Sequence, residues 1–186
     1  KIGSLFRQSV QQGKGVQALA VTAMFVALLI VFNRLIIWAA PTLKIGFGFL
    51  ALACIARLYG PVMAMKAGAI ADIVSYILYP VGGFYFPGFT LTKLLEGMIY
   101  GCCLYGGALN WRRIFLARAL VSFVLNVGLN SFWLKILYGQ AILAMLPTRL
   151  LKNALLFPVE VLLLFVIIRV VDRVSETSGH IHLGSS

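Results

Sequence analysis

The stretch VQALAVTAMFVALLIVFNRLII, residues 16–37, decides the class of this protein. It carries a single charged side chain, that of Arg34, and a helix of about 20 residues crosses the hydrocarbon core of a bilayer. Similar apolar stretches recur as far as Val171. Of the 186 residues, 61% are hydrophobic and 11% are charged, which is too little charge to cover a soluble domain. The sequence predicts a helical protein that crosses a membrane several times.

The apolar stretches divide into six predicted spans, at residues 16–37, 43–58, 61–80, 89–107, 113–137 and 148–172. Pro41 and the turn Tyr59–Gly60–Pro61 separate the first three spans, because proline cannot continue the hydrogen-bond ladder of a helix. We therefore expect an all-α membrane bundle of six helices at 16–172. Residues 1–15 are predicted to be a cytoplasmic or interfacial lead-in, and residues 173–186 a polar tail that could stem from an expression vector.

The net charge of +11 would suggest nucleic-acid binding in a soluble chain. Here the basic residues cluster at the ends of the predicted spans, as the positive-inside rule expects. With the N-terminus inside, ten Lys and Arg residues face the cytoplasm, among them Arg112, Arg113 and Arg118, and five face outward. We expect a multi-pass protein of the cell membrane with both termini inside and no nucleic-acid partner. The five outward residues, Arg34, Lys44, Lys135, Arg149 and Lys152, suggest a site for an anion.

Polar side chains recur at helical spacing on three predicted spans. The three groups are Asp72, Tyr76 and Tyr79; Asn126, Asn130 and Trp133; and Arg149, Lys152 and Asn153. A rise of about 1.5 Å per residue places these groups, with Arg34, in the outer half of the bundle. They predict one ligand site that is open to the outside. Hydrogen bonding between helices is the alternative explanation, most of all for Asn126.

Aromatic residues crowd the connection between the third and fourth spans, where Phe84, Tyr85, Phe86 and Phe89 stand among glycines and prolines. They form either a belt at the membrane interface or a lid over a flat ligand. The predicted site residues are Arg34, Asp72, Tyr76, Phe86, Phe89, Asn130, Trp133, Arg149, Lys152 and Asn153. Such a set suits a ligand that is planar, anionic and rich in donors and acceptors. A pterin joined to a carboxylate tail fits, and so do other aromatic anions.

The sequence has no phosphate-binding loop, no set of metal ligands and no nucleophile beside a base. We therefore expect no enzymatic activity and no cofactor of its own, and a partner that supplies the energy. Lys93 and Glu96, at i and i+3, are expected to neutralise each other, with a proton relay as the alternative. Glu160 is expected to pair with a Lys or Arg of a neighbouring helix.

Small residues line one face of the first span, at Ala20, Ala23 and Ala27. Small side chains allow another helix to approach closely. This face is either a surface that docks a partner or a contact within the bundle, as expected for Gly97 and Gly101.

Five stretches resemble the substrate-binding S components of energy-coupling factor (ECF) transporters, and specifically the folate type. They are IGFGF at 45–49, GAIAD at 68–72, FYFPGFTLT at 84–92, NVGLN at 126–130 followed by Trp133, and LPTRLLKN at 146–153. The resemblance implies a subunit that binds folate and works with a membrane coupling protein and two ATPases, which alone use ATP. It also implies docking through Ala23 and Ala27, and gates at residues 39–46 and 80–88. An S component for another vitamin or a pterin-like ligand, or a small membrane enzyme acting on a lipid-linked anion, remains as an alternative.

Overall fold

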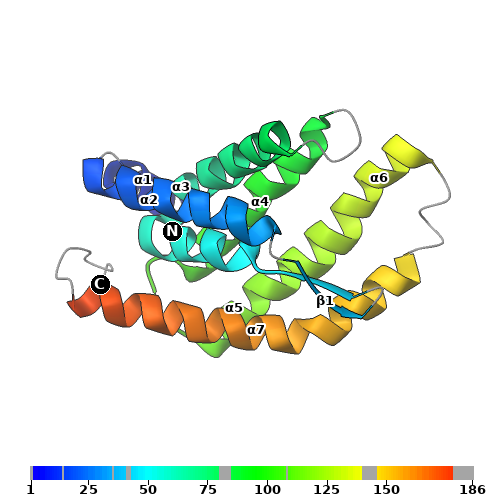
Figure 1. Ribbon diagram of the computed structural model, residues 1–186. Coiled ribbons are helices and arrows are strands. Elements are labelled where there is room, and N and C mark those ends of the chain that lie inside the picture. The colour runs from blue at the N-terminus through cyan, green and yellow to red at the C-terminus, as the bar shows by residue number, and fades with distance from the viewer. Residues whose placement is uncertain are drawn as a thin grey trace.

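The computed structural model describes residues 2–13, 15–34, 36–40, 43–79, 85–107, 109–139 and 146–177 (Figure 1). Its helices and strands, in chain order, are α1 Ile2–Gln12, α2 Val16–Arg34, β1 Ile36–Ala40, β2 Leu43–Gly46, α3 Gly48–Leu78, α4 Pro87–Leu104, α5 Trp111–Ala119, the π-helix η1 Leu120–Leu129, α6 Asn130–Tyr138 and α7 Leu146–Thr177. In Figure 1, α7 runs the length of the molecule along its lower side, opposite α1 and α2.

Four helical stretches of the described chain are long and apolar enough to cross a membrane, at 16–33, 48–78, 111–137 and 149–177. The second, α3, is broken at Gly60, whose backbone adopts φ 80° and ψ −171° directly before Pro61. It therefore supplies the second and third predicted spans, α4 supplies the fourth, and α5, η1 and α6 together supply the fifth. The predicted all-α membrane bundle of six helices is confirmed, while the side on which the termini lie stays a prediction.

The connection between the first two spans contains a short hairpin that the sequence analysis did not predict. β1 and β2 pair antiparallel, with Ile36 opposite Gly46 and Trp38 opposite Lys44. The predicted helical spans 16–37 and 43–58 were therefore wrong at these ends, since α2 stops at Arg34 and α3 begins at Gly48. Apolarity alone cannot separate the two structures, and β-branched residues such as Ile36 and Ile45 favour a strand.

The lead-in is a helix, α1, that packs on the break in α3. Ser9 is fully buried, and its hydroxyl donates to the carbonyl of Tyr59 at 2.6 Å and accepts from the amide of Val62 at 3.1 Å. A break in a helix leaves such backbone groups without their usual partners. One serine of α1 thus satisfies both sides of the break at Gly60. At the other end, α7 continues to Thr177, beyond the predicted end of the sixth span at residue 172.

The core lies where α3 and α4 pack most closely. An added Cβ on Gly97 would lie 2.5 Å from the carbonyl oxygen of Ala64, and one on Gly101 would collide with Pro61. The Gly97 and Gly101 pair therefore brings the two backbones together inside the bundle, as expected. Arg57 ties the same region to α7, because its guanidinium pairs with both carboxylate oxygens of Asp172 at 2.8 and 3.0 Å.

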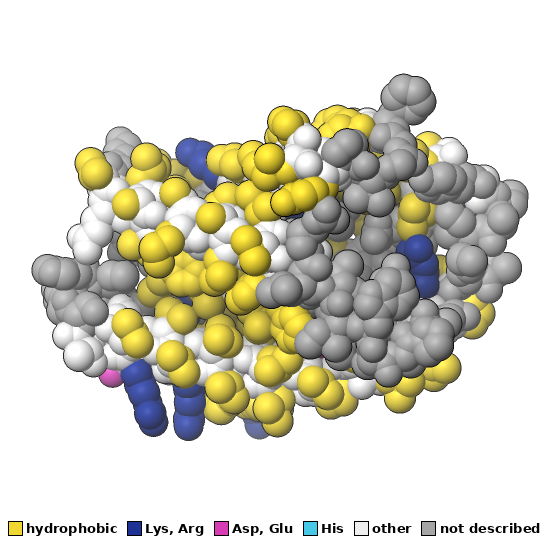
Figure 2. Space-filling view, in the orientation of Figure 1, with side chains coloured by type: hydrophobic (Ala, Val, Ile, Leu, Met, Phe, Trp, Pro, Cys, Tyr) yellow, Lys and Arg dark blue, Asp and Glu magenta, His cyan; other side chains and the backbone are white. Residues whose placement is uncertain are grey.

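The outer surface is apolar, as a lipid-facing surface requires. Figure 2 shows hydrophobic side chains spread over the visible face, with Lys and Arg side chains projecting at its lower edge. On α7 the exposed residues include Val159, Leu162, Val166 and Val170. These recur at the spacing of one helical face, which indicates that α7 presents this face to lipid.

Candidate ligand site

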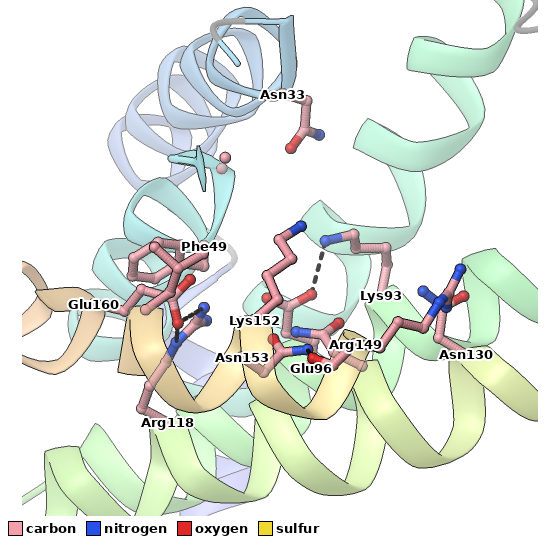
Figure 3. Close-up of a pocket in the computed structure, with 14 residues that line it drawn as sticks. Asn33, Phe49, Lys93, Glu96, Arg118, Asn130, Arg149, Lys152, Asn153 and Glu160 are labelled. Carbon is pink, nitrogen blue, oxygen red and sulfur yellow. Dashed lines mark hydrogen bonds and ion pairs between the residues drawn. The ribbon is translucent and has the colours of Figure 1, made fainter. Parts of the chain in front are cut away.

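A cavity of about 750 Å³ opens among the helices, and side chains from α2, α3, α4, α5, η1, α6 and α7 reach it (Figure 3). Its lining residues are Asn33, Gly46, Gly48, Phe49, Lys93, Glu96, Arg118, Asn126, Asn130, Arg149, Lys152, Asn153, Leu156 and Glu160. Ligand sites in proteins commonly have this size and combine apolar walls with a few polar groups.

Four of the predicted site residues meet in this cavity. Asn130 comes from α6, and Arg149, Lys152 and Asn153 come from the first turns of α7. Figure 3 shows Arg149 extending toward Asn130. The side-chain oxygen of Asn130 is buried and has no hydrogen-bond partner among the described residues. A buried acceptor without a partner costs free energy, so this oxygen is suited to receive a donor from a ligand.

Asp72 and Tyr76 belong to a different cluster, between α3 and α4. Thr90 donates to Asp72 at 2.6 Å and lies 2.5 Å from the hydroxyl of Tyr85, whose ring packs against Tyr76 at 5.4 Å. Within the described structure Thr90 is therefore a hydrogen-bond partner of Asp72, and it reaches the carboxylate from the neighbouring helix α4. Asp72 and Tyr76 are not among the residues that line the described cavity.

The predicted aromatic site residues Phe86, Phe89 and Trp133 pack against one another. Phe86 lies 5.7 Å from Phe89 and 5.6 Å from Trp133 between ring centroids, and the indole of Trp133 donates to Thr92 at 3.1 Å. Phe49 is the aromatic residue that lines the cavity within the described structure. The side chains of Arg34 and Lys44 and the loop residues 80–84, which include Phe84, lie outside the described residues.

The predicted basic partner of Glu160 is Arg118, and this ion pair lies at one end of the cavity. The Nε and Nη2 atoms of Arg118 lie 3.0 and 2.6 Å from one oxygen of Glu160, and Nη1 donates to the hydroxyl of Tyr100 at 2.8 Å. Phe49 covers the guanidinium, with its ring centroid 3.9 Å away. Arg118 was counted among the cytoplasmic basic residues, yet it is 3% exposed. The signal in the sequence that could have placed Arg118 here was Glu160. This acid was expected to find a basic partner on a neighbouring helix, and it does.

A second ion pair also faces the cavity. Lys93 and Glu96 pair at 2.8 Å, as the i and i+3 spacing predicted. Across the lining, four cationic side chains face two carboxylates, so two positive charges are in excess. The N-terminus of α7, with its positive dipole end, adds to this field beside Arg149 and Lys152. The cavity is therefore suited to an anion of up to two negative charges.

The alanine face of α2 points away from the bundle. Ala20, Ala23 and Ala27 are exposed, whereas Ala18 and Leu29 on the opposite face are buried. Packing within the chain was one explanation of the small residues. Within the described structure that explanation is wrong, because the buried face of α2 is a different one.

Comparison with known proteins places this architecture in a family. The model of the ECF transporter substrate-specific component matches residues 17–168. The chain belongs to this family. The folate transporter FolT of Clostridium novyi (strain NT) is 34% identical to this S component over 160 residues, covering 86% of the chain and 92% of the relative. FolT of Leuconostoc mesenteroides subsp. mesenteroides is also 34% identical, over 145 residues, covering 75% and 77%.

A solved structure is similar to this S component in fold as well. The crystal structure of FolT bound with folic acid superimposes with a TM-score of 0.73 at 35% sequence identity. The similarity covers 81% of this chain and 92% of that chain. The resemblance to folate-specific S components is therefore confirmed at the level of sequence and of fold.

Proposed function

We propose that this S component binds folate from outside the cell and delivers it inward as part of an ATP-driven ECF importer. The observation that carries the proposal is the cavity, with its excess of two positive charges and its amide side chains. Folate has a flat pterin ring and a glutamate tail with two carboxylates, so it matches both features. Relatives over most of the chain are folate transporters, which supports the same ligand.

We assign the glutamate tail to Arg149 and Lys152 at the start of α7, where a guanidinium and an ammonium group stand near the positive end of the helix dipole. Asn130 and Asn153 supply amide groups for the rest of the ligand. Arg34 joins this set in the proposal because its neighbour Asn33 lines the cavity. In the proposal, the groups that support the site from beside it are Asp72, Tyr76, Phe86, Phe89 and Trp133.

We propose that a transmembrane coupling protein and two cytoplasmic ATPases are the partners that supply the energy. In the same proposal this chain lies in the cell membrane with both termini inside. The exposed alanine face of α2 is the proposed docking surface, because small side chains permit close helix approach. This face lies opposite the side of α2 that packs on the core, so a partner can reach it without opening the ligand site.

The purified chain, without ATP or partners, is expected to bind folic acid or a reduced folate with a dissociation constant below about 1 µM, equivalent to about −8 kcal/mol. The reason is that the cavity and its charges come from this chain alone. Isothermal titration calorimetry, combined with mass analysis of ligand released from the purified protein, measures this. Tight binding of a different vitamin and none of folate would contradict the proposed ligand while keeping the transporter class.

Replacing Arg149 with Ala is expected to weaken folate binding about ten- to a hundredfold, since a hydrogen bond to a charged group contributes about 1.5–3 kcal/mol. Pteroic acid, which lacks the glutamate tail, is expected to lose much less. Lys135→Ala is the matched control, because Lys135 is an exposed basic residue that does not line the described cavity. An equal loss for both ligands would assign Arg149 to the ring or to the fold instead.

A further inference from the structure

Glu96 is an acid in the ligand cavity whose hydrogen-bonding capacity is largely uncommitted. It is 3% exposed and lines the cavity from α4. Among the described residues it receives one hydrogen bond, from the ammonium of Lys93 to its Oε2 atom at 2.8 Å. An ionised carboxylate offers about four lone-pair sites. The lysine keeps the buried charge compensated while most of these sites remain available for a ligand.

The other acid of the cavity is committed. Within the described part of the chain, both polar contacts of Glu160 come from Arg118, and that guanidinium is held in turn by Tyr100 and covered by Phe49. Lys93, the partner of Glu96, is held less firmly than Arg118, because its side chain is 32% exposed and reaches Glu96 from the side of the cavity. Figure 3 shows Lys93 and Lys152 pointing toward the same region, with Glu96 beneath them and Arg149 directed away toward Asn130.

Figure 3 shows Glu96 apart from the guanidinium of Arg149, which extends toward Asn130 and is one of the two basic groups assigned to the acidic tail. A carboxylate repels the acidic tail of a ligand and attracts a group that presents N–H donors. In a 2-amino-4-oxopyrimidine ring, the exocyclic amine and the neighbouring ring N–H stand side by side and can donate to the two oxygens of one carboxylate. This is the paired geometry that makes guanidinium–carboxylate contacts strong and directional.

We propose that Glu96 is the specificity-determining residue for the heterocyclic head of the ligand, and that it accepts hydrogen bonds from the 2-amino group and the adjacent ring N–H. The inference rests on the proposed function, and it fixes the orientation of the ligand, with its head at Glu96 and its acidic tail at Arg149. Lys93 pairs with the Oε2 atom of the same carboxylate and balances its charge.

The test varies one residue and one ligand group together. Folic acid and its 2-desamino analogue, which lacks only the exocyclic amine, are titrated into the unmodified protein and into Glu96→Gln. The unmodified protein is expected to prefer folic acid by about tenfold or more, because the analogue leaves a buried acceptor without its donor. In Glu96→Gln this preference is expected to fall to about twofold or less, through a loss of affinity for folic acid.

Glu176→Gln is the matched control, since Glu176 is an exposed acid on α7 outside the described cavity, and it is expected to change neither affinity. If Glu96→Gln does not fold, the comparison of the two ligands on the unmodified protein still decides, because equal affinities overturn the assignment. A preference that survives in Glu96→Gln overturns it as well. Absence of folic acid binding to the unmodified protein would instead overturn the proposed function.

Discussion

Ala23→Trp and Ala27→Trp are expected to abolish folate uptake while leaving folate binding to the purified chain unchanged. Both residues lie on the exposed face of α2, opposite the buried residues Ala18 and Leu29. A bulky side chain on this face keeps a partner helix at a distance, because close approach depends on small residues. Neither residue lines the ligand cavity. Uptake by cells, ligand affinity and capture of the coupling protein are measured on each variant.

Leu162→Trp is the matched control for these two substitutions. Leu162 is a well-exposed apolar residue of α7, so a tryptophan there enlarges a lipid-facing side chain without changing the alanine face of α2. Uptake by this control is expected to remain normal. The docking hypothesis fails if Ala23→Trp and Ala27→Trp lose folate affinity and thermal stability but still capture the coupling protein.

Arg118→Ala is expected to destabilise the protein by about 3–5 kcal/mol, because removal of one partner leaves an uncompensated buried charge. Glu160 is 6% exposed and would keep a carboxylate inside the bundle without the two N–H groups that now face it. A shift of this size corresponds to a fall in melting temperature of roughly 10 °C for a chain of this length. Thermal unfolding of the purified protein in detergent measures it.

The double variant Arg118→Met with Glu160→Leu separates the ion pair from the packing around it. Replacement of both partners by apolar side chains removes the buried charge, so it is expected to recover most of the lost stability. Arg112→Ala is the control on the same helix, since Arg112 is exposed, and its effect is expected to stay within about 0.5 kcal/mol. Equal losses in the single and double variants would assign the stability to packing of the arginine side chain.

The sequence predicted the cavity best where helical periodicity continues without a break. Arg149, Lys152 and Asn153 follow one another on the regular first turns of α7, so their spacing placed them on one face, and all three line the cavity. Asn126 and Asn130 also meet there. Asn126 lies inside the π-helix η1 and Asn130 directly follows it, and the i to i+5 hydrogen bonds of η1 alter the spacing on which such a prediction depends.

Other residues could not be placed, because their roles depend on contacts between helices. The spacing of Asp72 and Tyr76 is the same as that used for the residues of the fifth span, yet they face Thr90 and Tyr85 rather than the cavity. Arg118 follows Arg112 and Arg113 closely in sequence, so a count of charges assigned all three to one membrane surface. Only the packing of α5 against α7 turns Arg118 inward to Glu160.

The pair between Arg118 and Glu160 also has a consequence for how the chain enters the membrane during its synthesis. The two residues are 42 positions apart, so Arg118 leaves the ribosome before Glu160, the acid that pairs with it. At about 5–20 residues per second the wait lasts roughly two to eight seconds. Alone at the centre of a bilayer helix, an arginine costs about 2.5–3.5 kcal/mol to insert. Tyr100 and Phe49 are synthesised before Arg118, so their contacts with its guanidinium can form before Glu160 is present. Stable insertion of the fifth span is therefore linked to the synthesis of α7. A chain truncated before α7 lacks Glu160, the acid with which Arg118 pairs.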